Sequence, residues 1–189
     1  EMAARLDAVW SPAVRLVAFS HVTCETGTRL PADGICRWAR ERDCLSLVDA
    51  AQSLGTIPVS VPQIGCDYLA GNGHKWLHGP NGTGFLYASR ERMAELSPCH
   101  VGAGSFEATS IETGEARLWD SGKRFEFGTR SFALMTGWKE SLVWIQHIGL
   151  DAVYDHIGAM AGMLRSKLAR IEGVTVLTPD DSQAAAGLV

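Results

Sequence analysis

The chain has 189 residues, of which 46% are hydrophobic and 20% are charged, an ordinary balance for a globular protein that can bury a sizeable core. Its formal net charge of −4, without any basic run, argues against binding to nucleic acid or to an anionic membrane surface. No apolar stretch approaches the length of a membrane span and no signal peptide is visible at the start, so the sequence predicts a cytoplasmic protein.

The first third of the chain alternates helical patterns with short apolar runs. A helix is expected over residues 1–10, and a buried parallel strand over 14–20 because that run is continuously apolar. A helix of about ten residues is predicted to begin at Pro31, and the next strand covers 45–48. This alternation indicates a doubly wound α/β sheet. The i, i+3, i+4 spacing places three residues on the inward face of the second helix: Ile35, Trp38 and Ala39.

A glycine-rich turn then joins two further predicted strands, over 66–70 and 83–88, which are both apolar and expected to be buried. Between them, a first glycine pair delivers His74 and Lys75, and a second glycine loop follows at 79–84. Glycine lets the backbone approach a ligand closely and adopt positive φ. A lysine held in such a turn is placed for chemistry, although a solvated surface lysine is the alternative for this window taken alone.

The segments around that turn carry weaker patterns. Residues 52–55 are expected to form a short helix, and 59–64 a connecting loop. A short helix over 89–96 is predicted to be capped by Ser89. Residues 97–123 are rich in Gly, Ser, Thr and acids, and we expect them to be a mobile surface excursion.

Two amphipathic helices are predicted for the last third, over 131–147 and 151–171, with a break at Gly149. A strand is expected over 174–177. The five cysteines are odd in number and form no CxxC pair, so neither a metal site nor a disulfide framework is expected, and reduced, mostly buried thiols are the default.

An acid at a strand end gives the lysine a chemical partner. The strand over 45–48 ends at Asp49, and Gln52 follows within one turn. Ligand groups in open α/β sheets gather at the carboxyl ends of strands. Pyridoxal phosphate (PLP) needs a lysine for its aldehyde and a carboxylate for its pyridinium nitrogen, so Asp49 and Lys75 together suit this cofactor.

Three motifs, in order, resemble the class V aminotransferase family of fold-type I PLP enzymes, which includes cysteine desulfurases, selenocysteine lyases and isopenicillin N epimerase-like proteins. They are SHVTCETGTRLP at 20–31, VDAAQSLGTIPVSVPQIGCDYLAGNGHKWLHGPNGTGFLY at 48–87 and RFEFGT at 124–129, and the resemblance covers roughly residues 14–170.

The resemblance implies a mostly parallel sheet flanked by helices, the large domain of such enzymes, followed by the start of a small α+β domain. Part of the PLP-binding domain is expected over 1–147, an interdomain helix over 148–171, and the start of the small domain over 172–189. Because family members are usually about twice as long, the sequence is expected to be a fragment that lacks the aromatic residue stacked on PLP and the arginine for the substrate carboxylate.

The resemblance also assigns two catalytic residues. Lys75 would form the Schiff base and then move a proton at the substrate Cα, with its pKa lowered by partial burial and nearby cations. Asp49 would keep the ring nitrogen protonated, whereas a turn-forming aspartate is the alternative. Gln52 would donate to the ring hydroxyl oxygen, and the small side chain of Ala51 would lie under the ring.

The remaining cofactor contacts concern the phosphate. Asn72 and His74 would hold it through backbone N–H groups of the turn. Gly128 and Thr129 resemble the glycine-threonine pair that reaches the phosphate of the neighbouring subunit, which implies a homodimer with shared sites. His78 and His100 are expected to be ordinary core or surface residues.

The implied reaction acts at the Cα of an amino acid or amine substrate, as a C–S lyase, an aminotransferase (a transferase) or an epimerase. A cysteine desulfurase or selenocysteine lyase is the alternative. Asn72 weakens this alternative, because desulfurases usually carry serine at that position. In addition, no cysteine of this sequence matches their persulfide nucleophile. Cys24 stands where desulfurases show asparagine and is interpreted as a small buried filler. A PLP-free structural remnant is the non-enzyme alternative.

Overall fold

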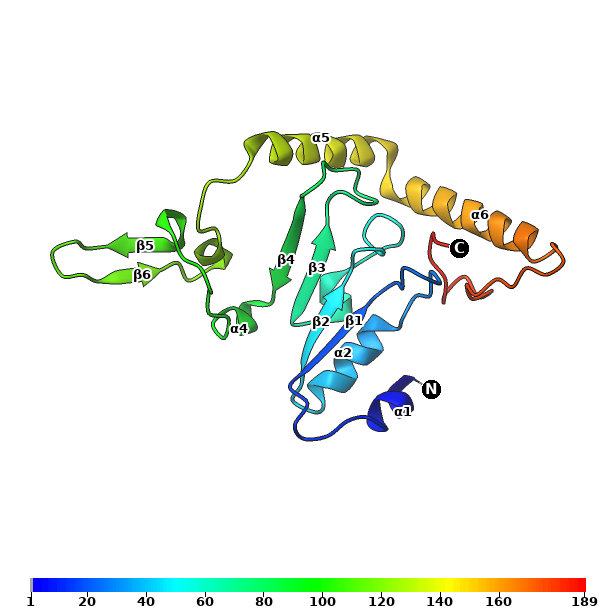
Figure 1. The fold of residues 1–189 in the computed structure, drawn as a ribbon, viewed down its shortest axis with the longest axis horizontal. Helices are drawn as coiled ribbons and strands as arrows, with labels where there is room; N and C mark the ends of the chain where they lie inside the picture. Colours follow the sequence, from blue (N-terminus) through cyan, green and yellow to red (C-terminus); the bar gives the residue numbers. More distant parts are fainter. Residues whose placement is uncertain (1) are drawn as a thin grey trace. The chain divides into compact units, whose positions relative to one another are not determined.

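The computed structural model describes residues 2–189 and divides into two compact units, which we treat separately (Figure 1). One unit holds the described residues up to Tyr87 together with Ala133–Val189, and the other holds Ala88–Phe132. The helices and strands of the first unit are α1 (Met2–Asp7), β1 (Leu16–Ser20), α2 (Ala32–Arg40), β2 (Leu45–Asp49), α3 (Val61–Ile64), β3 (Tyr68–Asn72), β4 (Gly84–Ala88), α5 (Phe132–Ile148) and α6 (Leu150–Leu168). Those of the second unit are α4 (Arg90–Met93), the 3₁₀ turns η1 (Ala103–Ser105) and η2 (Gly122–Phe125), and strands β5 (Phe106–Thr109) and β6 (Ala116–Leu118).

The four strands of the first unit form one sheet in the order β1-β2-β3-β4. β1 and β2 are parallel, with Ser20 opposite Asp49, and β2 and β3 are parallel, with Asp49 opposite Ala70. β4 runs in the opposite direction beside β3 (Figure 1). The prediction of a mostly parallel α/β sheet is therefore confirmed, and the carboxyl ends of β1, β2 and β3 meet at one edge of the sheet.

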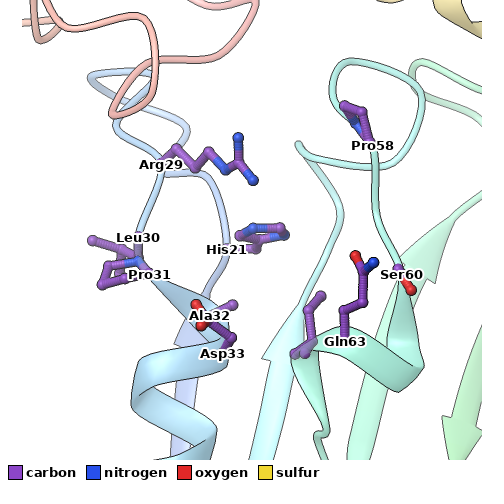
Figure 2. A pocket seen from close by; sticks show the side chains of 10 residues that line it. His21, Arg29, Leu30, Pro31, Ala32, Asp33, Pro58, Ser60 and Gln63 are labelled. Carbon is purple, nitrogen blue, oxygen red and sulfur yellow. The ribbon is translucent and has the colours of Figure 1, made fainter.

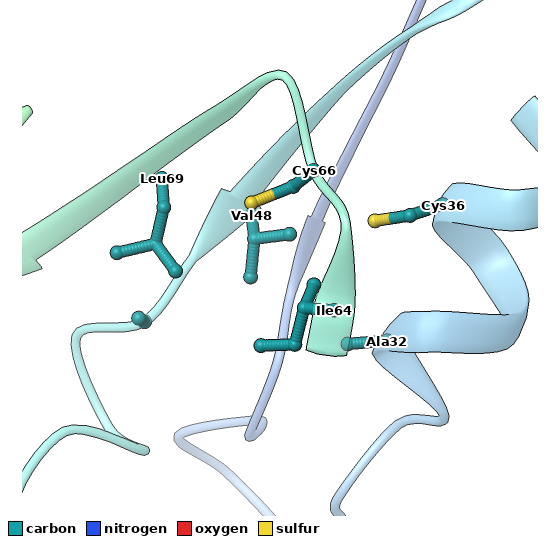
Figure 3. Close-up of a cluster of buried hydrophobic side chains, with 7 residues drawn as sticks. Ala32, Cys36, Val48, Ile64, Cys66 and Leu69 are labelled. Carbon is teal, nitrogen blue, oxygen red and sulfur yellow. The ribbon is translucent and has the colours of Figure 1, made fainter. Parts of the chain in front are cut away.

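The core of this unit lies between the sheet and α2 (Figure 3). The inward residues predicted for α2 are all buried, which confirms the helical spacing. The main cluster consists of Ala32, Cys36, Val48, Ala50, Ile64, Cys66 and Leu69. A second cluster joins Trp38 and Ala39 of α2 to Cys44.

Two short segments differ from the sequence-based expectation, and glycine explains both. Residues 52–55 form turns and not a helix, because Gly55 has a φ of 88° and interrupts helical geometry. The expected loop at 59–64 contains α3, a single turn with proline near its start that ends at Gly65 with a φ of 66°. Proline at the first positions and glycine just after the end are typical of short helices.

Two further expectations on strands are wrong. Residues 174–177 form no strand, because neither described sheet extends to them. β4 is largely exposed, with Leu86 at 62%, because it is the edge strand of its sheet. The segment 97–123 contains β5 and β6, which pair as an antiparallel hairpin, and its expected mobility stays a prediction. Ser89 does cap its helix, accepting a hydrogen bond from the backbone N–H of Arg92.

The two long helices agree with the sequence pattern. α5 and α6 are separated by Gly149, whose φ of 92° is unfavourable for any residue with a side chain. Within residues 2–189, no helix combines the length and the apolar character that crossing a bilayer requires.

Candidate cofactor site

Asp49 is held at the carboxyl end of β2 by contacts from both sides. Its Oδ1 accepts a hydrogen bond of 2.8 Å from the backbone N–H of Ala51, and the hydroxyl of Ser20, its register partner on β1, lies 3.5 Å from Oδ2. Asp49 is exposed, so its carboxylate can accept a further donor from the open side.

Lys75 lies in a tight turn that follows the neighbouring strand, β3. The turn is closed by the bond from Gly73 N–H to the carbonyl of Thr83 (2.9 Å) and by that from Gly79 N–H to the carbonyl of Gly73 (2.7 Å). Thr83 is buried, whereas Lys75 is exposed, and within residues 2–189 its amine has no hydrogen bond or ion pair. The backbone of the turn is thus fixed while the amine remains available.

The expectation that Lys75 is partly buried is not met by this chain. Asp49 is the last residue of β2 and Lys75 lies beyond the end of β3, and both residues are exposed. An exposed edge of this kind leaves room for a flat ring between two neighbouring strand ends.

Helix α5 supports the lysine turn, which the sequence pattern did not reveal. Trp138 stacks on Phe85 of β4, with ring centroids 6.3 Å apart, and its indole lies against Gly73 and Gly79. The hydroxyl of Ser141 donates to the carbonyl of His78 at 2.8 Å. The helical period predicted α5 but could not show which segment its side chains pack against.

Trp76 orients the side chain of Gln52, a second contact that sequence reasoning missed. The indole Nε1–H of Trp76 donates to Oε1 of Gln52 at 2.9 Å. Because an indole can only donate, this bond identifies Oε1 and leaves the amide NH₂ of Gln52 to donate elsewhere. Gly55 allows the two turns to touch, since a Cβ there would lie 2.7 Å from the carbonyl oxygen of Trp76.

Replacing Trp76 by phenylalanine is expected to keep the packing and remove this hydrogen bond, so that the Gln52 amide can rotate. A neutral hydrogen bond contributes about 1 kcal/mol, so cofactor affinity should fall about five-fold. Equilibrium titration of the stripped protein with PLP measures the change. Trp10→Phe, in an exposed segment outside the site, is the control, and equal affinities for both variants would contradict the role given to Trp76.

The expected phosphate contacts fall in different units. Asn72 ends β3, and the Nδ1 of His74 lies 3.2 Å from the carbonyl of Thr83. That carbonyl can only accept, so Nδ1 carries the proton and Nε2 is left for other contacts. Gly128 and Thr129 belong to the second unit and are exposed, so their contact with a phosphate stays a prediction.

Cys24 is exposed, so the interpretation as a buried filler is wrong. It lies in the irregular loop after β1 and belongs to none of the hydrophobic clusters of the described residues. A hydrogen bond with Glu25 raises the pKa of its thiol, while the charge of Lys75 acts in the opposite direction. A raised pKa makes the thiol a poor nucleophile near neutral pH.

His21 follows β1 and is buried, with 3% of its surface exposed. Its backbone N–H donates to the carbonyl of Asp49 at 2.8 Å. Burial, aided by the charge of Arg29, lowers the pKa of its imidazole from 6.5 to about 4. The ring is therefore neutral near pH 7.

This low pKa predicts a pH dependence of stability. Between pH 6.5 and 4 the unfolded chain binds more protons at this residue than the folded chain, so the free energy of unfolding should fall as the pH drops through that window, by up to about 3 kcal/mol. Urea unfolding at a series of pH values measures the slope. His21→Asn should flatten it, whereas His156→Asn, at an exposed position on α6, should leave it unchanged; a His21→Asn slope equal to that of the parent would contradict the assignment.

The side chains at this edge fit PLP in their chemistry. Asp49 offers an anchored carboxylate for a ring nitrogen, Lys75 an unpaired amine for an aldehyde, and Gln52 an amide NH₂ for a ring hydroxyl. The methyl side chain of Ala51, whose N–H holds Asp49, leaves space for a ring face. Among residues 2–189, no group of three or more His, Cys, Asp and Glu side chains is arranged to hold a metal ion.

Comparison with known proteins relates the chain to a single family. The family model described as aminotransferase class-V matches residues 2–189. The chain is 34% identical to isopenicillin N epimerase of Streptomyces clavuligerus, covering 100% of this chain and 49% of that protein. It is 32% identical to a probable cysteine desulfurase of Xylella fastidiosa (strain Temecula1), and the match covers 95% of this chain and 42% of that protein. The chain thus spans about half the length of the curated relatives that it matches.

Solved structures agree with the sequence relatives. The cystine C–S lyase C-DES, in complex with its reaction product cysteine persulfide, superposes with a TM-score of 0.88 at 33% identity over 97% of this chain and 49% of that chain. Another structure of C-DES, a lysine-to-alanine mutant, carries glycine covalently linked to its PLP cofactor.

Proposed function

Since the chain belongs to the aminotransferase class-V family, we propose that the protein is a PLP-dependent enzyme that acts at the Cα of an amino acid or amine substrate. The observation that carries the proposal is the pair of neighbouring parallel strand ends, which present the anchored carboxylate of Asp49 and the fixed turn of Lys75 at one edge of the sheet.

Lys75 has two tasks in this proposal. Its amine would be the covalent attachment point of the cofactor, and as a free amine it would take or return the proton at the substrate Cα. The closed turn at Gly73 and Gly79 limits the positions that the amine can reach. When bound, PLP supplies the electron sink for the pair left at Cα.

The residues after β2 hold and polarise the ring. Asp49 would keep the ring nitrogen protonated through its negative charge, and contacts with Ala51 and Ser20 orient its two oxygens. Gln52, oriented by Trp76, donates its NH₂ to the ring hydroxyl. Ala51 leaves the ring face free of steric conflict.

The phosphate is assigned to the turn and to a second subunit. Asn72 and His74 bind it from the same chain, and Gly128 and Thr129 reach it from the partner, so the proposed enzyme is a homodimer with shared sites. We place this dimer in the cytoplasm, with a small-molecule substrate and neither nucleic acid nor a membrane as partner. The division into a PLP-binding domain over 1–147, an interdomain helix over 148–171 and the start of a small domain over 172–189 belongs to the same proposal.

Three reaction branches share the first proton transfer: C–S lyase, aminotransferase and epimerase. Relatives named cystine C–S lyase and isopenicillin N epimerase support an amino acid substrate. A cysteine desulfurase or selenocysteine lyase is the second candidate, supported by the relatives named cysteine desulfurase. Cys24 is not proposed as its sulfur-accepting nucleophile, because the pKa of that thiol is raised.

The test is direct detection of the cofactor and of its attachment point. The purified protein is reduced with borohydride, digested and mapped by mass spectrometry, and the label is expected on Lys75. A panel of amino acids, including cysteine and cystine, is then assayed for sulfide, keto acid and racemised product. Absence of any PLP uptake would favour the structural-remnant alternative, and a label on another lysine would overturn the site.

A further inference from the structure

A cavity with a volume of about 250 Å³ lies in the first unit, beside the amino end of α2 (Figure 2). His21 and Arg29 line one side, and Ser60 and Gln63 line the other. Drug-sized ligands usually occupy larger spaces, of about 300–1,000 Å³, so this cavity suits a group of only a few heavy atoms with some water.

Four of the polar side chains that line this cavity lack partners. The Nδ1 of His21 is buried and makes no hydrogen bond. Within the described chain, the side chains of Arg29, Ser60 and Gln63 also have no hydrogen bond or ion pair. A buried polar atom without a partner is unfavourable by about 1–3 kcal/mol, and such atoms in native proteins usually have a water molecule, an ion or a ligand as partner.

The charges around the cavity favour an anion. Arg29 is a permanent cation, and α2 begins at the cavity with Pro31 as N-cap and without a side-chain cap, so its first N–H groups stay available. Asp33 is the opposing charge, but it pairs with Arg37 at 3.2 Å. Arg29 also has a larger influence on the imidazole of His21 than Asp33 does. The neutral imidazole can present Nδ1–H as a donor.

The cavity is separate from the candidate cofactor site. Ser20 contacts Asp49 at the carboxyl edge of the sheet, whereas His21 is the next residue, and successive side chains of an extended chain point to opposite faces. His21 accordingly points away from Asp49 Oδ2 and into the space between α2 and the loop that contains Pro58 (Figure 2). None of the residues assigned to PLP lines this cavity.

We propose that this cavity is a binding site for a small oxyanion, of the phosphate, sulfate or carboxylate type, held by the Arg29 guanidinium, the His21 Nδ1–H and the amino end of α2, with Ser60 and Gln63 as further donors. Bidentate arginine contacts and helix N–H groups are the usual ligands of such anions. The site is independent of the proposed PLP chemistry, since it shares no residue with it.

The test is a titration of the PLP-loaded protein, so that added anions do not enter the cofactor's own phosphate site. Inorganic phosphate, sulfate and acetate are added separately, and binding is followed by calorimetry and by the ¹⁵N signals of the histidine rings. Saturable binding with a shift of the His21 Nδ1 signal is expected for at least one probe. A response to phosphate and sulfate indicates an inorganic anion, and a response to acetate alone indicates a carboxylate.

Two variants and a matched control make the test specific. Arg29→Gln should weaken binding at least about ten-fold, since it removes the charged ligand. Arg170→Gln, which replaces an exposed arginine after α6 that lies outside the cavity, should change it less than two-fold. Gln63→Leu, on α3, should weaken binding about three-fold and covers the case in which Arg29→Gln does not fold. Absence of binding for all three probes, or equal binding in Arg29→Gln and Arg170→Gln, would overturn the proposal.

Discussion

Lys75→Ala is expected to abolish covalent attachment of PLP and to lower turnover by at least about 10³-fold, since one residue serves as both attachment point and proton carrier. The amine has no other partner within residues 2–189, so its removal should hardly affect folding. The measurements are the visible absorption of the protein, the borohydride-fixed label and kcat with the best substrate of the panel.

Lys139→Ala is the matched control for this prediction. Lys139 is an exposed lysine on α5 whose amine lies 3.1 Å from Glu140, a surface contact of little energetic weight. The Lys139→Ala variant should leave the visible absorption, the borohydride-fixed label and kcat unchanged. A fixed label that persists in Lys75→Ala would move the attachment point elsewhere and refute the assignment.

Gly73→Ala is expected to be strongly destabilising although it adds a single methyl group. A Cβ at this position would lie 2.6 Å from Cε2 of Trp138 and would also collide with the hydroxyl of Thr83. Neither neighbour can yield easily, because Thr83 is buried and its hydroxyl is bonded to the carbonyl of Pro80 at 2.7 Å. Overpacking of this kind lowers the free energy of unfolding by about 1–3 kcal/mol or more.

The same change should also impair the site, because Gly73 closes the turn that holds Lys75. Denaturant unfolding gives the stability, and PLP titration of the folded fraction gives the cofactor affinity, which should fall at least about ten-fold. Gly158→Ala on α6 is the control: a Cβ there meets nothing within 4 Å, and alanine favours helix, so stability should rise by about 0.5–1 kcal/mol. If Gly73→Ala were as stable as the parent, Trp138 would not pack tightly on the turn.

Local pattern was sufficient for the elements that carry the site. Continuous apolar runs identified β1, β2 and β3, and helical spacing identified the inward face of α2, because burial repeats with the period of the element. The local pattern gave the wrong secondary structure for residues 52–55 and 174–177. Positive φ at Gly55 and the lack of a neighbouring strand decided those segments, and neither is a property of a short apolar window.

The sequence by itself determined the family, and it predicted the cofactor and the candidate residues Asp49, Gln52, His74 and Lys75, because motif order and residue type are local properties of the chain. Only the tertiary structure decided that Trp76 orients Gln52, that Trp138 packs on the lysine turn and that Cys24 is exposed. These contacts join side chains far apart in sequence, or depend on what surrounds a loop. Hydrophobic spacing shows that a side chain is buried, but not which partner it meets.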